Sequence, residues 1–525
     1  MADTFDVIVI GSGFGGAVTA CRMAEKGARV LVLERGRRWV PKDYPRDVGD
    51  AWLWDQDEPH KQNGWIDLRL FDDMAVAQGA GVGGGSLIYA NIFVEAKPDV
   101  FNQGWPPEIT YAELAPYYET TGKMLGVQEL PDSQLTERFK LMREAAGSIG
   151  HADRFRKLPL AVTFDPDWRY DLEDPFSEEH SKTWTNPHGV EQGTCIHLGN
   201  CDIGCEVRAK NTLDVNYLAV AERSGAEIRP LHMVTAVEPY QSGYRVTFDW
   251  LERGRRVPGS VRADTVVLGA GSLGSTELLL RCRTQHKTLP DLSSFLGHSW
   301  SSNGDFLTPA VYDGRRVSPT QGPTITSAID FLDGSVDGEQ FFIEDGGFPD
   351  VLGNFLTERV GKRHKGWRAR VLFGAFQEIL RARDPLSGVM PWFAQGIDAA
   401  DGKLYLGRKW YAPWRQVLKL DWDIDRSEGV VDAIVAMHER LAAATGGRPM
   451  VPPTWSLLKN LVTPHPLGGC NMGTTSANGV VNHLGEVFGY PGLYVADGAI
   501  VPEAVGLNPS RTIAALAERI AAHID

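Results

Sequence analysis

The hydrophobic pattern of the first 35 residues predicts a strand, a tight turn, a helix and a second strand. Residues 5–10 are almost wholly apolar, which is typical of a buried strand, and residues 17–26 have helical spacing that ends at Gly27. Residues 29–33 form a second short apolar run, which ends at Glu34. This order of elements predicts an α/β domain at the start of the chain.

The rest of the chain alternates between helical and strand patterns. Thr110 stands where a helix N-cap is expected. Residues 150–192 are rich in Pro and Asp and show no clear period, and no internal repeat is present. Predicted helices cover residues 110–148, 210–224, 272–281, 430–444 and 512–523, and predicted strands cover residues 227–237, 244–249 and 265–268.

An irregular stretch, residues 39–74, is rich in Trp, Asp and Pro. Its composition predicts a long surface loop or lid. Trp52, Trp54, Trp65 and Phe71 would give such a lid an apolar inner face.

Composition restricts the class of protein. The chain has 525 residues, enough for two to four folding units at roughly 150 residues each, and it is 43% hydrophobic and 23% charged. It has no apolar run near the ~18 residues of a membrane helix. A formal charge of -14 disfavours nucleic acid as a partner. The first residues lead directly into a strand without a signal peptide, so we expect a cytoplasmic protein.

A glycine-rich turn lies between the first strand and the first helix. Gly11, Gly13 and Gly16 fit the pattern G-x-G-x-x-G, and the turn also contains Phe14 and Gly15. In this context the turn brings backbone amides and a helix N-terminus to a pyrophosphate. Glu34 ends the next strand, where a carboxylate accepts both ribose hydroxyls of a dinucleotide. The alternative is a tight turn that binds nothing.

Four further motifs occur in order along the chain and carry a family resemblance. The segments GVGGGS (81–86), GAGSLG (269–274), PHPLGGC (464–470) and LYVADG (493–498), the last followed by GLNP (506–509), resemble the motifs of the glucose-methanol-choline (GMC) flavin oxidoreductases. HPLGG and the cysteine-rich turn before AKNTL are similar to the cholesterol-oxidase branch. The resemblance implies FAD as the cofactor.

The resemblance also implies the architecture. The fold class is then α/β plus α+β, with a Rossmann-like FAD-binding domain and a substrate domain. An antiparallel sheet of about six strands, backed by helices, forms the substrate domain. The expected FAD-binding domain is discontinuous and covers residues 1–110, 193–300 and 461–525, and the expected substrate domain covers residues 111–192 and 301–460.

Oxidation of an alcohol by a flavin requires a base for the hydroxyl proton, and histidine is suited to this task. The resemblance assigns that role to His465, which lies between two prolines, and pairs it with Asn508. Glu344 lies in a stretch that is similar to one in cholesterol oxidase, where a glutamate moves a proton when a steroid double bond isomerises. Its neighbours here, Asp345 and Gly346, are more polar than in that pattern.

The remaining predicted site residues contact the cofactor. Asn91 follows the second glycine loop and is expected near flavin N5, while the backbone at Val234 is expected to hold adenine. We expect noncovalent attachment, because no histidine lies between residues 79 and 91. The predicted cofactor-binding residues are Gly11, Gly13, Phe14, Gly15, Gly16, Glu34, Gly81, Gly85, Ser86, Asn91, Val234, Asp497, Gly498, Asn508 and Pro509.

A cluster of three cysteines, Cys195, Cys201 and Cys205, leaves several interpretations open. Structural thiols without a metal are the favoured one. The spacing also resembles an iron–sulfur motif of some GMC glucose dehydrogenases. Zinc would need a fourth ligand, which His188 or His197 could supply.

The resemblance implies an enzyme that oxidises a bulky, hydrophobic, sterol-like secondary alcohol to a ketone, with FAD as hydride acceptor. O2, a quinone or a carrier protein would then take the electrons. The alternatives are a dehydrogenase of a sugar or aromatic alcohol, a non-redox hydroxynitrile lyase, and a nucleotide-binding protein without catalysis.

Overall fold

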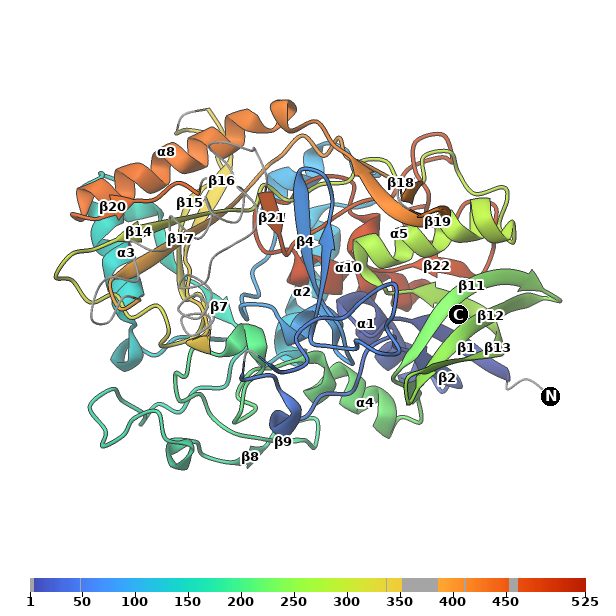
Figure 1. Cartoon of the computed structure of the whole chain (residues 1–525), viewed down its shortest axis with the longest axis horizontal. Coiled ribbons are helices and arrows are strands. Elements are labelled where there is room, and N and C mark those ends of the chain that lie inside the picture. Colours follow the sequence, from blue (N-terminus) through green and yellow to red (C-terminus); the bar gives the residue numbers. More distant parts are fainter. Residues whose placement is uncertain (1–3, 48, 337, 352–385, 410–411, 453–460) are drawn as a thin grey trace.

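The computed structural model describes residues 4–47, 49–336, 338–351, 386–409, 412–452 and 461–525. The predicted first unit forms strand β1 (Thr4–Ile10), helix α1 (Phe14–Glu25) and strand β2 (Val30–Leu33) at the centre of a seven-stranded sheet (Figure 1). The strand order is β10 (Glu227–Arg229), β2, β1, β13 (Arg255–Leu268), β12 (Gly243–Glu252) and β11 (His232–Tyr240), and β22 (Leu493–Val495) also pairs with β13.

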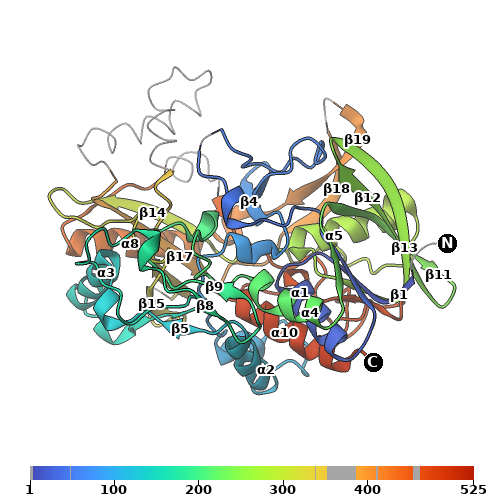
Figure 2. The same ribbon diagram turned by 90° about the horizontal axis from the view of Figure 1, so that it is seen from below.

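The central part of this sheet is parallel, as a Rossmann-like domain requires. β1 pairs in parallel with β2 and β13, while β11, β12 and the start of β13 form an antiparallel extension. α1 packs against α4 (Tyr217–Arg223) and the C-terminal helix α10 (Ser510–His523), and the three lie together in Figure 2. Arg22 of α1 forms an ion pair with Glu518 of α10 at 2.7 Å. α5 (Gly271–Arg281) follows β13.

The helix predicted over residues 210–224 is shorter than expected. A 3-10 turn covers Leu213–Val215, and α4 begins only at Tyr217, whose backbone N–H donates to the Asn216 side chain. Short polar side chains in this segment bond locally, as Thr212 does to Asp214, and such bonds compete with helix formation.

The second large sheet has six strands, and every pair in it is antiparallel, which confirms the expected substrate-domain sheet. Helices α3 (Glu137–Ser148) and α8 (Glu428–Ala444) pack against it. The domain boundaries themselves stay a prediction. The strand order is β20 (Arg448–Pro449), β14 (Phe306–Val311), β17 (Val389–Gly396), β16 (Phe341–Asp345), β15 (Ser327–Phe331) and β6 (Phe155–Lys157).

The other elements are small. Helix α2 (Tyr111–Met124) begins after its N-cap Thr110, whose hydroxyl accepts a bond from the Glu113 N–H, so the predicted N-cap is confirmed.

No helix of the described segments has the length and apolar character needed to cross a membrane. The remaining strands are β3 (Ile66–Leu70), β4 (Met74–Gly79) and β21 (Leu461–Thr463) in one sheet, and the pairs β5 (Gln128–Glu129) with β7 (Pro159–Leu160), β8 (Trp184–Thr185) with β9 (Glu191–Gln192), and β18 (Lys403–Lys409) with β19 (Ala412–Asp421).

The prediction of an apolar lid over residues 39–74 is wrong for Trp65, which lies in a core. Trp65 is fully buried and packs edge-on against Trp39, with ring centroids 5.2 Å apart. Trp54 is also buried, beneath the Arg35 guanidinium. Trp39 and Trp65 form a small core with Leu87, because burial of a large indole surface is strongly favourable. Trp54 lies on the lining of the main cavity instead.

Candidate active site

A cavity of about 920 Å³ connects the glycine turn of the first sheet with the second sheet. Its size is typical of a site that encloses a small-molecule ligand or cofactor. One end is lined by Gly13 and Glu34, and another part by His465 and Asn508. The predicted dinucleotide site and the predicted reaction site therefore share one continuous space.

Two glycine loops meet at the wall of this cavity. Gly11 has a φ of +92°, and a Cβ there would lie 2.6 Å from the carbonyl oxygen of Gly269. Gly84 has a φ of +52°, and its Cβ would lie 2.5 Å from Gly13 Cα. Only glycine permits this backbone approach. The open space above Gly13, at the start of α1, fits a pyrophosphate that binds to backbone amides.

Glu34 is buried at the end of β2 and lines the cavity. Its Oε2 accepts bonds from Ser12 N at 3.1 Å and Ser12 Oγ at 2.6 Å, and its Oε1 accepts one from Gly36 N at 2.8 Å. These bonds hold the carboxylate rigidly beside the glycine turn. Free lone pairs remain for the ribose hydroxyls of a dinucleotide.

Replacing Glu34 by alanine is expected to weaken FAD binding by at least about tenfold, because a hydrogen bond to a charged group contributes about 1.5–3 kcal/mol. The dissociation constant for FAD can be measured by fluorescence titration of the apoprotein. Glu34→Gln, which keeps one carbonyl acceptor, should lose less affinity. Equal affinity in the wild type and the alanine variant would contradict the role of Glu34.

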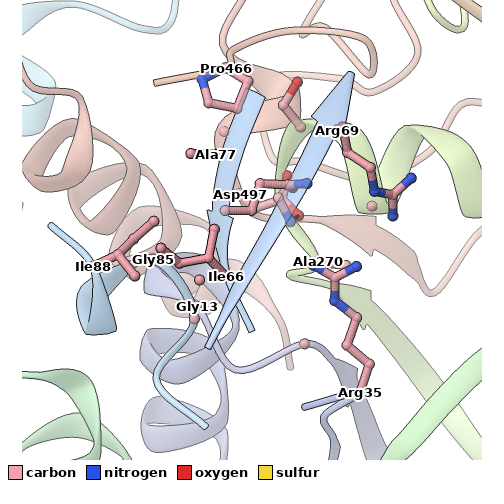
Figure 3. A pocket seen from close by; sticks show the side chains of 18 of the residues that line it. Gly13, Arg35, Ile66, Arg69, Ala77, Gly85, Ile88, Ala270, Pro466 and Asp497 are labelled. Atoms are coloured by element: carbon pink, nitrogen blue, oxygen red, sulfur yellow. Dashed lines mark hydrogen bonds between the residues drawn. The ribbon is translucent and has the colours of Figure 1, made fainter. Parts of the chain in front are cut away.

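Charged side chains form the wall opposite the glycine turn. Arg35 and Arg69 extend toward each other in Figure 3, and both bind the buried Asp67, Arg35 Nη1 at 2.8 Å and Arg69 Nε at 2.8 Å. Arg69 also contacts Glu277 of α5 at 3.2 Å. This network joins β3 to α5 across the cavity and places two cations on its lining.

Most of the predicted cofactor residues line the cavity, but four lie behind its wall. Ser86 is buried and donates to Gly83 O at 2.7 Å, so it supports the loop from behind. Gly81 packs against Trp39, and Asn91 is buried with its side chain beside the Cys201 thiol. Gly16 packs against Gly11. The lining residues are Gly11, Gly13, Phe14, Gly15, Glu34, Gly85, Val234, Asp497, Gly498, Asn508 and Pro509.

Asp497 joins two segments of this site. Its Oδ2 accepts bonds from Gly271 N at 2.8 Å and Ser275 Oγ at 2.6 Å, and its Oδ1 accepts one from Ala499 N at 2.8 Å. Burial raises the pKa of this carboxyl, and the three donors oppose the rise. Asp497 therefore fixes the start of α5 against the C-terminal segment at the cavity edge.

His465 is held by a carboxylate that the sequence did not indicate. Its Nδ1 lies 2.8 Å from Asp305 Oδ1 and 3.0 Å from Oδ2, and its backbone N–H donates to Thr463 Oγ1 at 2.8 Å. Asp305 is fully buried, which raises its pKa, while His465 and Thr463 oppose the rise. With Nδ1–H donated to Asp305, the lone pair of the neutral imidazole is on Nε2. No described residue forms a hydrogen bond with Nε2, and the ring lines the cavity.

One turn, residues 301–305, orients both members of the predicted pair. Asn303 is buried there with a φ of +59°, and its Oδ1 accepts bonds from Val505 N at 2.9 Å and Gly506 N at 3.0 Å. Its Nδ2 donates to Leu507 O at 2.9 Å. Asn303 thus fixes the backbone just before Asn508, and Asp305, two residues later, fixes His465.

Glu344 lies behind the cavity surface beside Asn508. It is fully buried at 0% exposure, and Gln395 Nε2 donates to its Oε2 at 2.9 Å. Burial raises its pKa to about 8; Gln395 and Asn508 oppose the rise, and the nearby carboxyls of Asp345 and Asp305 add to it. Glu344 is therefore mostly protonated at neutral pH. Its role in isomerisation stays a prediction.

The raised pKa of Glu344 predicts a pH dependence of stability. Between about pH 4.5 and 8 the folded chain keeps a proton that the unfolded chain releases, so stability falls as pH rises through this window and levels off above it. Glu344→Gln removes this pH-dependent contribution to the free energy of unfolding. The free energy of unfolding of Glu344→Gln minus that of wild type should rise by a few kcal/mol from pH 5 to pH 9, as measured by denaturant titrations. The exposed Glu137→Gln serves as control, and a flat difference for Glu344→Gln would contradict the assignment.

The three clustered cysteines are free thiols. Burial raises the pKa of each, which disfavours the thiolate that a metal or cluster requires. Within the described residues, no group of three or more His, Cys, Asp or Glu side chains is arranged to hold a metal ion. Both ring nitrogens of His197 have other partners, Tyr170 and Gln134, and His188 Nε2 contacts the Met124 carbonyl.

Comparisons with known proteins agree with this geometry. Residues 400–517 match the C-terminal model of the GMC oxidoreductases, and residues 9–60 match an NAD(P)-binding Rossmann-like domain. The chain is 32% identical to a cholesterol oxidase of Acinetobacter baumannii over 99% of its own length and 94% of that protein, and 32% identical to one of Mycobacterium tuberculosis over 99% and 91%. The structure of pyridoxine 4-oxidase from Mesorbium loti superposes with a TM-score of 0.63 at 16% identity, covering 98% of each chain.

The fold and the shared cavity define an FAD-dependent oxidoreductase that acts on alcohols. The chain belongs to the GMC oxidoreductase family, within its cholesterol-oxidase-like branch. FAD is its cofactor, as the glycine turns and Glu34 indicate.

Proposed function

We propose that this protein oxidises a bulky, apolar secondary alcohol to a ketone, with His465 as the base. The observation that carries the proposal is the His465–Asp305 pair, because Asp305 fixes the tautomer and directs the basic Nε2 into the cavity. FAD, when bound, supplies the acceptor for the carbinol hydride.

The chain itself handles the proton and the position of the substrate. His465 Nε2 accepts the hydroxyl proton, and the negative Asp305 stabilises the imidazolium that results. Asn508 lines the cavity, so its Nδ2 amino group is suited to donate a hydrogen bond to the substrate oxygen while the hydroxyl proton goes to His465. Asn303 prevents the backbone before Asn508 from shifting.

The apolar part of the lining supports a bulky substrate. Leu307, Ile325 and Phe393 come from the second sheet and its loops and contribute to the cavity, and the Phe393 ring lies 6.3 Å from the His465 ring. Burial of apolar surface contributes about 25 cal/mol per Å², so a fused-ring alcohol gains several kcal/mol over a small alcohol before the cost of ordering. Cholesterol oxidases are the relatives with the highest identity given above.

An anaerobic substrate screen tests the proposal. Steroid alcohols, glucose and benzyl alcohol are mixed with the oxidised enzyme, and flavin bleaching is followed by stopped-flow absorbance. Steroid alcohols should exceed glucose by at least about 100-fold in specificity constant, which corresponds to roughly 2.7 kcal/mol. Efficient bleaching by glucose without a response to steroids would contradict the proposal and favour a sugar dehydrogenase. Reoxidation by O2 or by a quinone then identifies the electron acceptor.

A further inference from the structure

The cavity lining includes the carboxyl group of Asp202, which the proposed reaction does not use. Asp202 lies in the short 3-10 turn Cys201–Ile203, which is clamped from both sides. Trp65 Nε1 donates to the Asp202 carbonyl at 3.1 Å, and Lys210 Nζ donates to the Cys201 carbonyl at 2.6 Å. The clamped turn holds Asp202 and Ile203 on the cavity lining.

The Asp202 carboxyl is poorly satisfied. Its one described hydrogen bond, from Thr324 Oγ1 to Oδ1, is long at 3.3 Å. Burial raises its pKa to about 6, and attraction to Lys210 and Arg138 limits the rise, so the group is mostly ionised at neutral pH. A carboxylate that loses water on ligand binding needs a new donor, since an unpaired buried charge is costly.

Asp202 and the reacting groups belong to different sets of contacts. His465 contacts Asp305, and Asn508 contacts Glu344. Asp202 instead bonds Thr324 and is attracted to Lys210. The cavity lining near Asp202 includes Ile203, Thr324, Ile325 and Gly347. A ligand that passes the apolar side chains of this part therefore meets one charged acceptor beside one hydroxyl.

We propose that Asp202 and Thr324 form a polar subsite that binds a second hydroxyl group of the alcohol substrate, away from the carbon that is oxidised. This inference rests on the proposed function and narrows its substrate class to bulky alcohols that carry a further hydrogen-bond donor. A purely hydrocarbon group at this position would strip water from the carboxylate without replacing it. A ketone there would present a second acceptor to the negative charge.

Two steroids that differ at one position test the subsite. Androstenediol and dehydroepiandrosterone share the reacting hydroxyl and the ring system, but the far ring carries a hydroxyl in the first and a ketone in the second. The specificity constant for oxidation of the shared hydroxyl is measured by flavin bleaching and product analysis. Wild type should prefer the diol by at least about tenfold, as expected for a hydrogen bond to a charged acceptor.

Asp202→Leu should bring this preference to about one while FAD content stays unchanged. The preference of Asp202→Asn should lie between those of the wild type and Asp202→Leu. Glu206→Gln is the matched control, because Glu206 lies on the next turn of chain but pairs with Arg46 and is not part of the lining. A preference near one in the wild type, or one that Asp202→Leu leaves intact, overturns the subsite while the proposed function stands. Failure of both steroids to bleach the flavin overturns the proposed function, and the subsite with it.

Discussion

Replacing His465 by alanine should slow flavin reduction by about 100- to 10,000-fold, because the hydroxyl proton then has no positioned acceptor as the hydride leaves. Single-turnover stopped-flow experiments without oxygen measure this step separately from reoxidation. FAD content should equal that of wild type, since the residues of the glycine turns and Glu34 are untouched.

Asn508→Ala is the comparison for this variant. It should slow reduction less, because it removes an orienting amide and leaves the base in place. Reduction of the His465→Ala variant at the wild-type rate, with FAD bound, would exclude His465 as the base.

Asp305→Asn should slow the same step by about 100-fold, although Asp305 acts only through His465. The amide can accept or donate, so it no longer enforces one imidazole tautomer, and it does not stabilise the imidazolium. The fall should appear in the limiting rate of reduction and leave the dissociation constant for substrate nearly unchanged. Asp305→Glu should restore part of the rate.

A matched variant separates positioning from simple support of the turn. Asp398 accepts bonds from Ser301 Oγ at 2.7 Å and Ser302 N at 2.8 Å, and so anchors the same turn without contact to His465. Asp398→Asn is expected to lower stability more than the reduction rate. If both variants slow reduction equally, Asp305 has no special role beyond holding the turn.

The parts of the site that the sequence predicted are those with local signals. The glycine turns, Glu34 and the C-terminal segment each occupy a few consecutive residues whose spacing follows from backbone geometry. Residues of all these segments line one cavity.

Asp305 carried no comparable signal. It lies 160 residues before His465, within the polar run SSNGD, and such a run is also typical of an ordinary surface turn. Only strand β14, which begins at Phe306, places this turn beside the histidine. Asp202, which lies among the cysteines, also carried no signal in the sequence, because burial and cavity shape are tertiary properties.

The predictions for Trp65 within residues 39–74 and for Lys210 failed because side-chain burial depends on partners that are distant in the sequence. The tryptophans of residues 39–74 were interpreted from composition, yet their burial depends on partners such as Tyr44 and Arg35, which pattern alone does not pair. Lys210 was assigned to a helix, but it precedes the 3-10 turn Leu213–Val215, and its ammonium bonds the carbonyls of Leu87 and Cys201.

The ion pair between Arg22 and Glu518 has a consequence for synthesis of the chain. β1 is made well before its neighbour β13, which ends at Leu268, and α10, which packs on α1, follows later still. Contacts of such sequence separation form slowly and leave apolar surface exposed meanwhile. FAD therefore meets a complete binding site only once Asn508 and α10 have been made, so the glycine turn exists long before the segments that complete its cavity.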